Sequence, residues 1–338
     1  MTDLKTNYLG IPLKNPVVVG ACKLTSNIDS LKKIENAGAA AVVLKSLFEE
    51  QIGYESYQME EELTMYNERY AEMITIHPDI KHGGASEHIA FVKEAKNALN
   101  IPVIGSINAV SKEIWIEYSK LVEEAGVDAL ELNFYHVPVD FDKTSEMIEQ
   151  EQIDLVSEIC KNSVVPVSVK LSMSYSNPLN IIKRMKKAGV SGVVLYNRVF
   201  KPDINLKDEK NIYPIDFSSY SDIRNALRTI GLAYDKIDID LIGSNGVFSG
   251  LDVAKSILVG ADAVQVVSSL YKNGIDQIGE ILNSLKKWMT EKGYNSLEDF
   301  RGKLSKSKNK DIFAFERAQY VDILMNIEKI FVKTEDIL

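Results

Sequence analysis

The sequence predicts an α/β fold, a (β/α)8 TIM barrel, and the first observation behind this prediction is a repeated helix-to-strand junction. Four times a helix-like stretch ends in a small cluster around a glycine and continues directly into an apolar run. Glycine at a helix end can adopt the left-handed conformation that closes the helix. The β-branched run that follows is typical of a buried parallel strand. The clusters are Ala37-Gly38-Ala39, Ala125-Gly126-Val127, Ala188-Gly189-Val190 and Val259-Gly260-Ala261.

The second observation is that four further strands fill the gaps, so that eight strands alternate with eight helical patterns. The expected strands are Val17–Cys22, Ala40–Ser46, Pro102–Asn108, Ala129–Tyr135, Val165–Leu171, Gly192–Asn197, Ile237–Asn245 and Ala263–Ser269. The expected helices are Ile28–Ala37, Glu87–Leu99, Lys112–Glu124, Ser145–Lys161, Pro178–Ala188, Ser221–Ile230, Leu251–Val259 and Ile275–Lys292. This alternation favours a closed barrel. An open doubly wound sheet remains the competing topology, because the pattern alone does not show closure.

Two segments fall outside the repeat. Residues 48–84 are long for a βα loop, and such insertions usually shape the mouth of a barrel. Their acidic run is equally well explained as a solvated surface helix over Glu55–Glu72. We therefore expect a barrel domain over residues 1–304, with this insertion, and a C-terminal helical extension over residues 305–338.

The C-terminal extension begins with a polar hinge, Ser305–Lys310, followed by apolar residues at helical spacing. That stripe indicates packing in the core or in a dimer rather than a ligand site. Its members are Phe313, Phe315, Tyr320, Ile323, Leu324, Ile327, Ile330 and Phe331.

Composition excludes several classes of function. The chain has 338 residues, which suits one barrel of ~250 residues with extra segments. A net charge of −9 argues against a nucleic-acid partner, because such binding depends on Lys and Arg. Cys22 and Cys160 form no CxxC motif, which argues against metal and iron–sulfur sites and fits a reducing cytosol. No apolar run is long enough to span a membrane, and Met1–Pro16 does not resemble a signal peptide. We expect a cytoplasmic protein.

Small polar turns follow the seventh and eighth strands. The seventh strand ends in Gly243-Ser244-Asn245-Gly246 and the eighth in Ser268-Ser269. Loops at these two places in a barrel often bind phosphate through backbone N–H groups. Each could also be a plain tight turn. No GxGxxG motif is present, so a Rossmann dinucleotide site is not supported.

Polar residues at other strand ends suggest a ligand in the barrel mouth. Lys45 with Ser46 closes the second strand and Lys170 the fifth. A lysine in a buried strand is costly unless it meets an anion or partner, although salt-bridged lysines are common at surfaces. Asn108, Asn133 and Asn197 lie at the ends of three more strands, where Asn is depleted. Together they suggest hydrogen bonding to a planar, amide-rich ligand, although any one alone would more often be a cap.

Short motifs occur here in a fixed order between residues 5 and 304. They are Asn15-Pro16, Gly20-Ala21-Cys22, Lys45-Ser46, Glu131-Leu132-Asn133, Val169-Lys170-Leu171, Asn197, Asn245-Gly246, Ser268-Ser269, Lys292-Gly293-Tyr294, Leu297-Glu298-Asp299-Phe300 and Gly302-Lys303-Leu304. In this order they resemble the class 1 dihydroorotate dehydrogenases, FMN-dependent (β/α)8 enzymes of pyrimidine biosynthesis.

The resemblance implies a site for FMN, for which the residues would be Ala21, Lys45, Ser46, Asn108, Asn133, Lys170, Asn245, Gly246, Ser268 and Ser269. It implies that Asn133 and Asn197 bind the substrate, dihydroorotate, which is oxidised to orotate by hydride transfer to FMN. Lys170 would face the N1/O2 edge of the flavin and stabilise the negative charge of its reduced form. A general base on the opposite face would take the proton.

The sequence departs from the family where this base should lie. After Glu-Leu-Asn the family has Ser-Cys-Pro-Asn, whereas this chain continues Phe134-Tyr135-His136-Val137-Pro138-Val139. His136 falls at the position of the family's cysteine base, and an unperturbed histidine pKa of ~6.5 suits the role. Tyr135 is the weaker candidate, and His136 could instead only pack or cap the loop. Lys45 is the second expected catalytic residue. The family's downstream Asn is Val139 here, which removes a substrate hydrogen bond.

The loop that grips orotate in the family is also replaced. The corresponding region reads His77-Pro78-Asp79-Ile80-Lys81-His82-Gly83-Gly84, in which Lys81 or His82 could still bind an anion. Two alternatives to a dihydroorotate dehydrogenase therefore remain: an enzyme with a different cyclic-amide substrate, and a flavin-binding barrel without catalysis. A tRNA dihydrouridine synthase would need a basic surface, and an aldolase would use Lys170 as a Schiff-base lysine. By elimination a soluble electron acceptor is favoured over a quinone, and a homodimer is compatible with the sequence.

Overall fold

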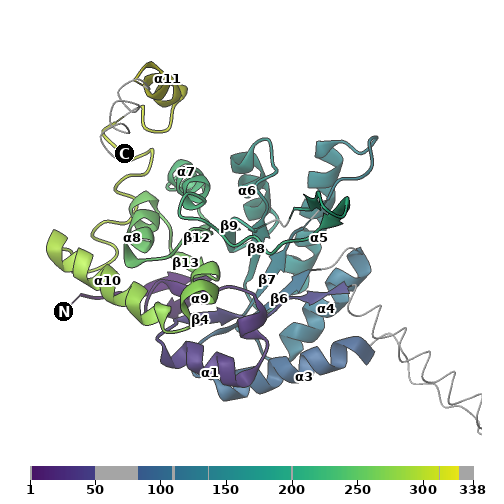
Figure 1. Cartoon of the computed structure of the whole chain (residues 1–338). Helices are drawn as coiled ribbons and strands as arrows, with labels where there is room; N and C mark the ends of the chain where they lie inside the picture. Colours follow the sequence, from purple (N-terminus) through teal and green to yellow (C-terminus); the bar gives the residue numbers. More distant parts are fainter. Residues whose placement is uncertain are drawn as a thin grey trace, which may run out of the picture.

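The computed structural model describes residues 2–49, 83–108, 111–135, 137–198, 201–311 and 313–326, and its centre is a closed parallel barrel (Figure 1). The strands are β3 (Val17–Val19), β4 (Ala41–Val43), β6 (Val103–Asn108), β7 (Ala129–Asn133), β8 (Val167–Leu171), β9 (Gly192–Leu195), β12 (Asp240–Ser244) and β13 (Ala263–Val266). Each pairs with the next, β13 pairs with β3, and β4 pairs with β6. This closure confirms the predicted barrel and excludes the open sheet. A short strand, β5 (Leu47–Phe48), extends the pairing with β6.

Helices surround the barrel in the predicted order (Figure 1). They are α1 (Ile28–Asn36), α3 (Gly83–Ala98), α4 (Lys112–Glu124), α5 (Ser145–Asn162), α6 (Pro178–Lys187), α7 (Ile223–Ala233), α8 (Gly250–Val259) and α10 (Gln277–Lys292). The four glycines predicted to end helices have φ values between 94° and 115°. The left-handed conformation expected from the sequence is therefore confirmed.

Several strands end earlier than the sequence predicts. The first stops at Val19, before Cys22, and a 3-10 turn, η1 (Lys23–Thr25), follows. The eighth stops at Val266, and Ser268 instead begins a short helix, α9 (Ser268–Asn273). There the amides of Leu270 and Tyr271 bond to the carbonyl of Val267, so the backbone turns into a helix instead of continuing the ladder. The prediction of a strand through Ser269 is therefore wrong.

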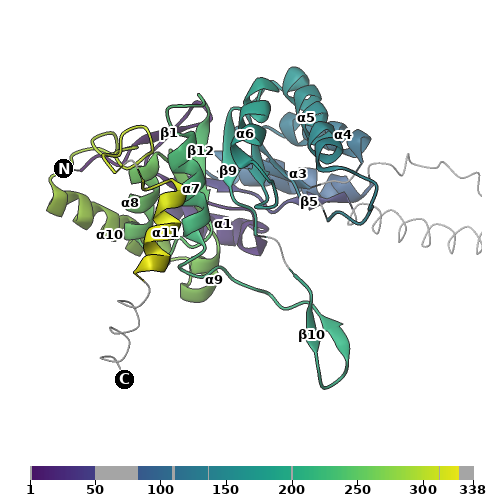
Figure 2. The ribbon, with the colours of Figure 1, turned by 90° about the horizontal axis from the view of Figure 1, so that it is seen from above.

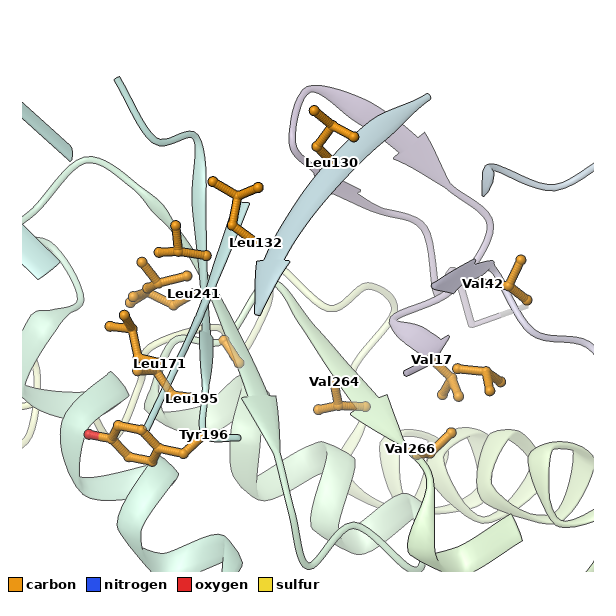
Figure 3. Close-up of a cluster of buried hydrophobic side chains, with 14 of the residues drawn as sticks. Val17, Val42, Leu130, Leu132, Leu171, Leu195, Tyr196, Leu241, Val264 and Val266 are labelled. Carbon is orange, nitrogen blue, oxygen red and sulfur yellow. The ribbon is translucent and has the colours of Figure 1, made fainter. Parts of the chain in front are cut away.

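Alternate residues of each strand face either the helices or the barrel interior. Those that face the helices form the main hydrophobic core, part of which is shown in Figure 3. Among them Val17, Leu130, Leu171 and Leu195 are fully buried. Burying one such side chain contributes about 1.5–3 kcal/mol, so this layer holds the helices on the barrel. A second cluster fills the interior with apolar residues from several strands, including Ala41, Ala129, Ile242 and Ala263.

An N-terminal hairpin closes one end of the barrel interior. It consists of β1 (Thr6–Tyr8) and β2 (Ile11–Leu13), and Tyr8, Leu9 and Leu13 pack into the interior cluster. The Leu9 amide donates to Asp240 Oδ2 at 2.6 Å. The polar residues of the strands that point inward lie toward the other end. Among the described elements, this is therefore the end at which an active site can form.

A second hairpin was not foreseen. It lies between β9 and α7, is formed by β10 (Asp203–Asn205) and β11 (Lys210–Ile212), and projects away from the barrel (Figure 2). Its side chains are largely exposed, with Leu206 at 85%. Polar residues fill most of this segment, so no alternating pattern marks its strands.

The C-terminal segment leaves the barrel and includes α11 (Arg317–Met325), in which no side chain is buried. Packing in the core is therefore wrong for the members of the predicted apolar stripe that lie in this helix, which are Tyr320, Ile323 and Leu324. Phe315 does contact the barrel, since its ring lies against Gly231 of α7. Dimer packing remains a prediction, and Ile327, Ile330 and Phe331 lie outside the described residues, as does most of the 48–84 insertion.

Among the residues that the structure describes, no helix is both long enough and apolar enough to cross a bilayer.

Candidate active site

A cavity of about 510 Å³ opens at the carboxyl ends of the strands. Lys170 of β8 and Gln265 of β13 line its base, and the segments after β3, β9, β12 and β13 form its sides. The segment over residues 215–218 forms a further wall. Ligand cavities of ~300–1,000 Å³ are typical for small molecules and cofactors. The C-terminal face of a barrel is also where its enzymes place their active sites.

A buried polar triad forms the base of this cavity. Lys170 Nζ donates to Gln265 Oε1 at 2.9 Å, and Gln265 Nε2 donates to Glu131 Oε2. Lys170 Nζ also lies 3.9 Å from Glu131 Oε1. Burial raises the pKa of Glu131, while the Lys170 charge and the Gln265 hydrogen bond oppose that rise. Buried charges require such partners, so the strands supply a cation and its counter-charge together.

A tight turn after β12 forms one side of the cavity. Asn245 and Gly246 both have φ of 68°, and Asn245 Nδ2 donates to the Tyr196 carbonyl at 2.8 Å. A Cβ on Gly246 would lie 2.5 Å from the Ile223 amide nitrogen, so only glycine fits. The Gly246 amide donates to Ser218 Oγ at 3.2 Å. The Ser218 amide in turn donates to Ser268 Oγ at 3.0 Å, which joins the turn, the 215–218 segment and α9.

Arg198 holds the 215–218 segment in place. Its guanidinium lies 2.6 Å from Asp216 Oδ2 and 2.7 Å from Asp222 Oδ2. It also donates to the carbonyls of Asp216 and Phe217. Burial would raise the pKa of Asp222, but the Ser219 amide and Arg198 together hold that pKa below its usual value. One side chain therefore makes three contacts to this wall of the cavity and ties it to Asp222 at the start of α7.

An amide pair lies at the mouth of the barrel. Asn197 lines the cavity and donates from Nδ2 to Asn133 Oδ1 at 2.7 Å. Asn133 is the last residue of β7, and Tyr135 beyond it is 40% exposed. The two asparagines expected to bind substrate are thus brought together. His136, the expected base, lies outside the described residues.

The structure places the expected cofactor residues in two groups. Those that line the common cavity are Ala21, Lys170, Asn245, Gly246 and Ser268. Asn133 reaches it through Asn197, as described above. Ser46, Asn108, Lys45 and Ser269 do not line it.

The residues outside the cavity have other surroundings. Ser46 Oγ lies 2.7 Å from Ser106 Oγ inside the barrel, and Asn108 is the last residue of β6. Lys45 is half-buried near His88, where burial and the Lys45 charge lower the pKa of His88 to about 4. Ser269 is fully buried, and its Oγ has no hydrogen-bond partner among the described residues.

Sequence reasoning missed several residues of the site. Gln265 could have been found, because it stands within the apolar strand Ala263–Val266 as Lys170 stands within its own strand. In the sequence, Glu131 stands out only as the first residue of the Glu131-Leu132-Asn133 motif. Arg198 and Ser218 carried no local signal, since their roles depend on a loop that returns to the cavity from a distance.

Comparison with known proteins identifies the family. The dihydroorotate dehydrogenase family model matches residues 3–289, and the chain belongs to that family. It is therefore an oxidoreductase of the kind that acts on CH–CH bonds, as the resemblance predicts.

Individual relatives are similar over most of their length. The catalytic subunit of dihydroorotate dehydrogenase B (NAD(+)) from Thermoplasma volcanium is 31% identical over 315 residues, 89% of this chain and 98% of the relative. That of Methanocaldococcus jannaschii is 28% identical over 309 residues, 88% and 97% respectively. The NAD-dependent dihydropyrimidine dehydrogenase subunit PreA of Escherichia coli is 23% identical over 323 residues, 89% and 76%.

Proposed function

We propose that the protein is an FMN-dependent oxidoreductase that oxidises dihydroorotate to orotate in pyrimidine biosynthesis. The observation that carries this proposal is the Lys170 cation at the base of a cavity whose side is the Asn245-Gly246 turn. The Lys170 cation suits a ring that gathers negative charge, and the small polar turn suits a phosphate group.

The residues present fit FMN. Lys170 offers a buried ammonium group, and Val247, Val267 and Phe217 offer apolar walls for a flat ring. Glycine at position 246 lets the backbone turn closely, and Ser268 Oγ lies in the same wall. Lys170 would then hold positive charge beside the ring, while Asn245, Gly246 and Ser268 would hold the phosphate. Bound FMN supplies the acceptor for the hydride.

The same proposal assigns the residues that bind the substrate and the residue that accepts its proton. Asn133 and Asn197, already hydrogen-bonded to each other, would exchange that bond for bonds to the substrate's amide groups. His136 would act as general base, and Lys45 would assist from the end of β4. Both roles rest on the sequence pattern. The remaining cofactor assignments, Ser46, Asn108 and Ser269, have the same basis, with Ala21 supported by its place in the cavity.

The wider setting of the protein follows from the same proposal. The relatives' name, catalytic subunit, suggests that electrons pass onward to another protein, and we propose a soluble electron acceptor. We propose a cytoplasmic setting, where Cys22 and Cys160 remain free. Residues 1–304 would form the barrel domain, and the exposed apolar residues of the 305–338 extension would pack in a homodimer.

An anaerobic titration with dihydroorotate tests the proposal. Loss of the oxidised flavin absorbance on addition of dihydroorotate is the expected result, and His136→Ala should slow that bleaching by at least ~10²-fold, as expected for a general base. A flavin-containing protein that stays oxidised would refute dihydroorotate as substrate. Because one relative is a dihydropyrimidine dehydrogenase subunit, the same titration with dihydrouracil tests the second candidate, a different cyclic amide.

A further inference from the structure

Beneath the cavity lies a carboxylate that no step of the proposed reaction uses. Glu131 is on β7, is fully buried and does not line the cavity. Its Oε2 accepts a hydrogen bond from Gln265, whereas its Oε1 has no hydrogen-bond partner among the described residues. The charge that faces this second oxygen is the Lys170 ammonium, at 3.9 Å.

The hydrogen bonds fix the direction of the triad. Lys170 only donates, and an ionised Glu131 only accepts, so the Gln265 amide between them has one workable orientation. Its oxygen faces Lys170 and its nitrogen faces Glu131, as observed. Lys170 is thereby held between the cavity on one side and a carboxylate on the other. Tyr8, from the N-terminal hairpin, is a further titratable group close enough to feel the Glu131 charge; burial and that charge raise the pKa of its hydroxyl, so Tyr8 carries no charge at physiological pH.

We propose that Glu131 is a positioning residue that sets how much of the Lys170 charge reaches the cavity and so sets the reduction potential of a flavin bound there. This inference rests on the proposed function. A carboxylate behind an ammonium offsets part of its field on the far side, and in a dry interior that offset is weakly screened. Glu131 therefore makes the flavin harder to reduce. Gln265, which is hydrogen-bonded to both side chains, holds Glu131 and Lys170 in fixed positions relative to each other.

The test is the midpoint potential of the flavin in the holoprotein. Glu131→Gln keeps the shape and removes the charge, so more of the Lys170 field reaches the cavity. We expect a rise of at least about 30 mV, which is a tenfold gain in affinity for the reduced over the oxidised flavin in a two-electron couple. Sulfite, which adds to oxidised flavin and leaves negative charge on the ring, should bind at least ten times more tightly as well.

Asp128→Asn provides the matched control. Asp128 lies directly before β7, the strand that carries Glu131, and pairs with a cation, Lys96 at 2.5 Å, but it does not line the cavity. Its neutralisation should leave the potential and the sulfite affinity unchanged.

The inference would be overturned by a Glu131→Gln protein whose flavin potential is equal to or below that of the wild type, or by an equal rise in the control. A wild-type protein that holds no flavin would refute the proposed function, and this inference with it. If Glu131→Gln does not fold, Glu131→Asp keeps the charge but draws it back from Lys170, and a potential unchanged from the wild type would then refute the role.

Discussion

Removal of the Arg198 guanidinium should loosen the cavity wall formed by residues 215–218. In Arg198→Ala this wall loses two carbonyl contacts and its ionic link to Asp216, and the ionic link that ties Arg198 to Asp222 at the start of α7 is lost as well. The Asp216 side chain is 72% exposed, so its pair contributes little, whereas Asp222 is 30% exposed and its pair is stronger. Hydrogen bonds to charged groups contribute about 1.5–3 kcal/mol each, and solvent reduces this, so we take about 2 kcal/mol for the whole set.

That free energy corresponds to a roughly 30-fold weaker retention of FMN, since each 1.4 kcal/mol is a factor of ten. The assay is fluorescence titration of the apoprotein with FMN. Arg184→Ala is the control, because Arg184 also pairs with two carboxylates, Glu146 and Glu149, but joins α6 to α5 outside the cavity. A dissociation constant for Arg198→Ala within about twofold of the wild type and the control would refute the reasoning.

Two further predictions concern the turn after β12 and the histidine beside Lys45. Gly246→Ala should weaken FMN binding and lower the free energy of unfolding by about 1–3 kcal/mol, because it strains a residue at positive φ and presses a methyl group on the Ile223 amide. Urea unfolding of the apoprotein measures the change in stability, and FMN titration measures the change in affinity. A variant unchanged in both measurements would contradict the argument. His88 has a folded pKa of about 4, below its unfolded value, so the unfolded chain binds more protons between about pH 4 and 6.5 and stability falls as pH falls through that window. Between pH 7.5 and 5 the loss due to His88 should be about 2 kcal/mol, and urea unfolding of His88→Phe at the two pH values should show a pH dependence smaller by that amount.

Local pattern was enough to predict the barrel, because each glycine stop and each apolar strand is encoded by neighbouring residues. The same logic found Lys170, a charge within an apolar strand, and the Asn245-Gly246 turn. Gln265 carries the same signal, a polar residue within the apolar strand Ala263–Val266. Only the structure shows that Lys170, Gln265 and Glu131 meet, since they come from β8, β13 and β7.

Other features depend on contacts that local sequence does not contain. Strand ends were overestimated at Cys22 and Ser269 because the ladder stops where the barrel opens, a point set by neighbouring strands rather than by propensity. The β10–β11 hairpin is polar and exposed, so no buried face gives it a period. The apolar stripe after residue 313 predicted packing, but in α11 these side chains face outward from a single chain. Arg198 acts through a segment about twenty residues further along, which no spacing rule connects to it.

The hairpin at residues 6–13 also has a consequence for the order of events during folding. Its anchors are remote in the chain: the Leu9 amide bonds to Asp240, 231 residues away, and Thr6 Oγ1 bonds to the Asp262 carbonyl, 256 residues away. Arg301 bonds to Thr6 across 295 residues. Contacts of such long sequence separation form late because the loop they close is entropically costly. On the ribosome, residues 6–9 must therefore wait until Arg301 has emerged, and until then the apolar interior of the incomplete barrel stays open to chaperones and to aggregation.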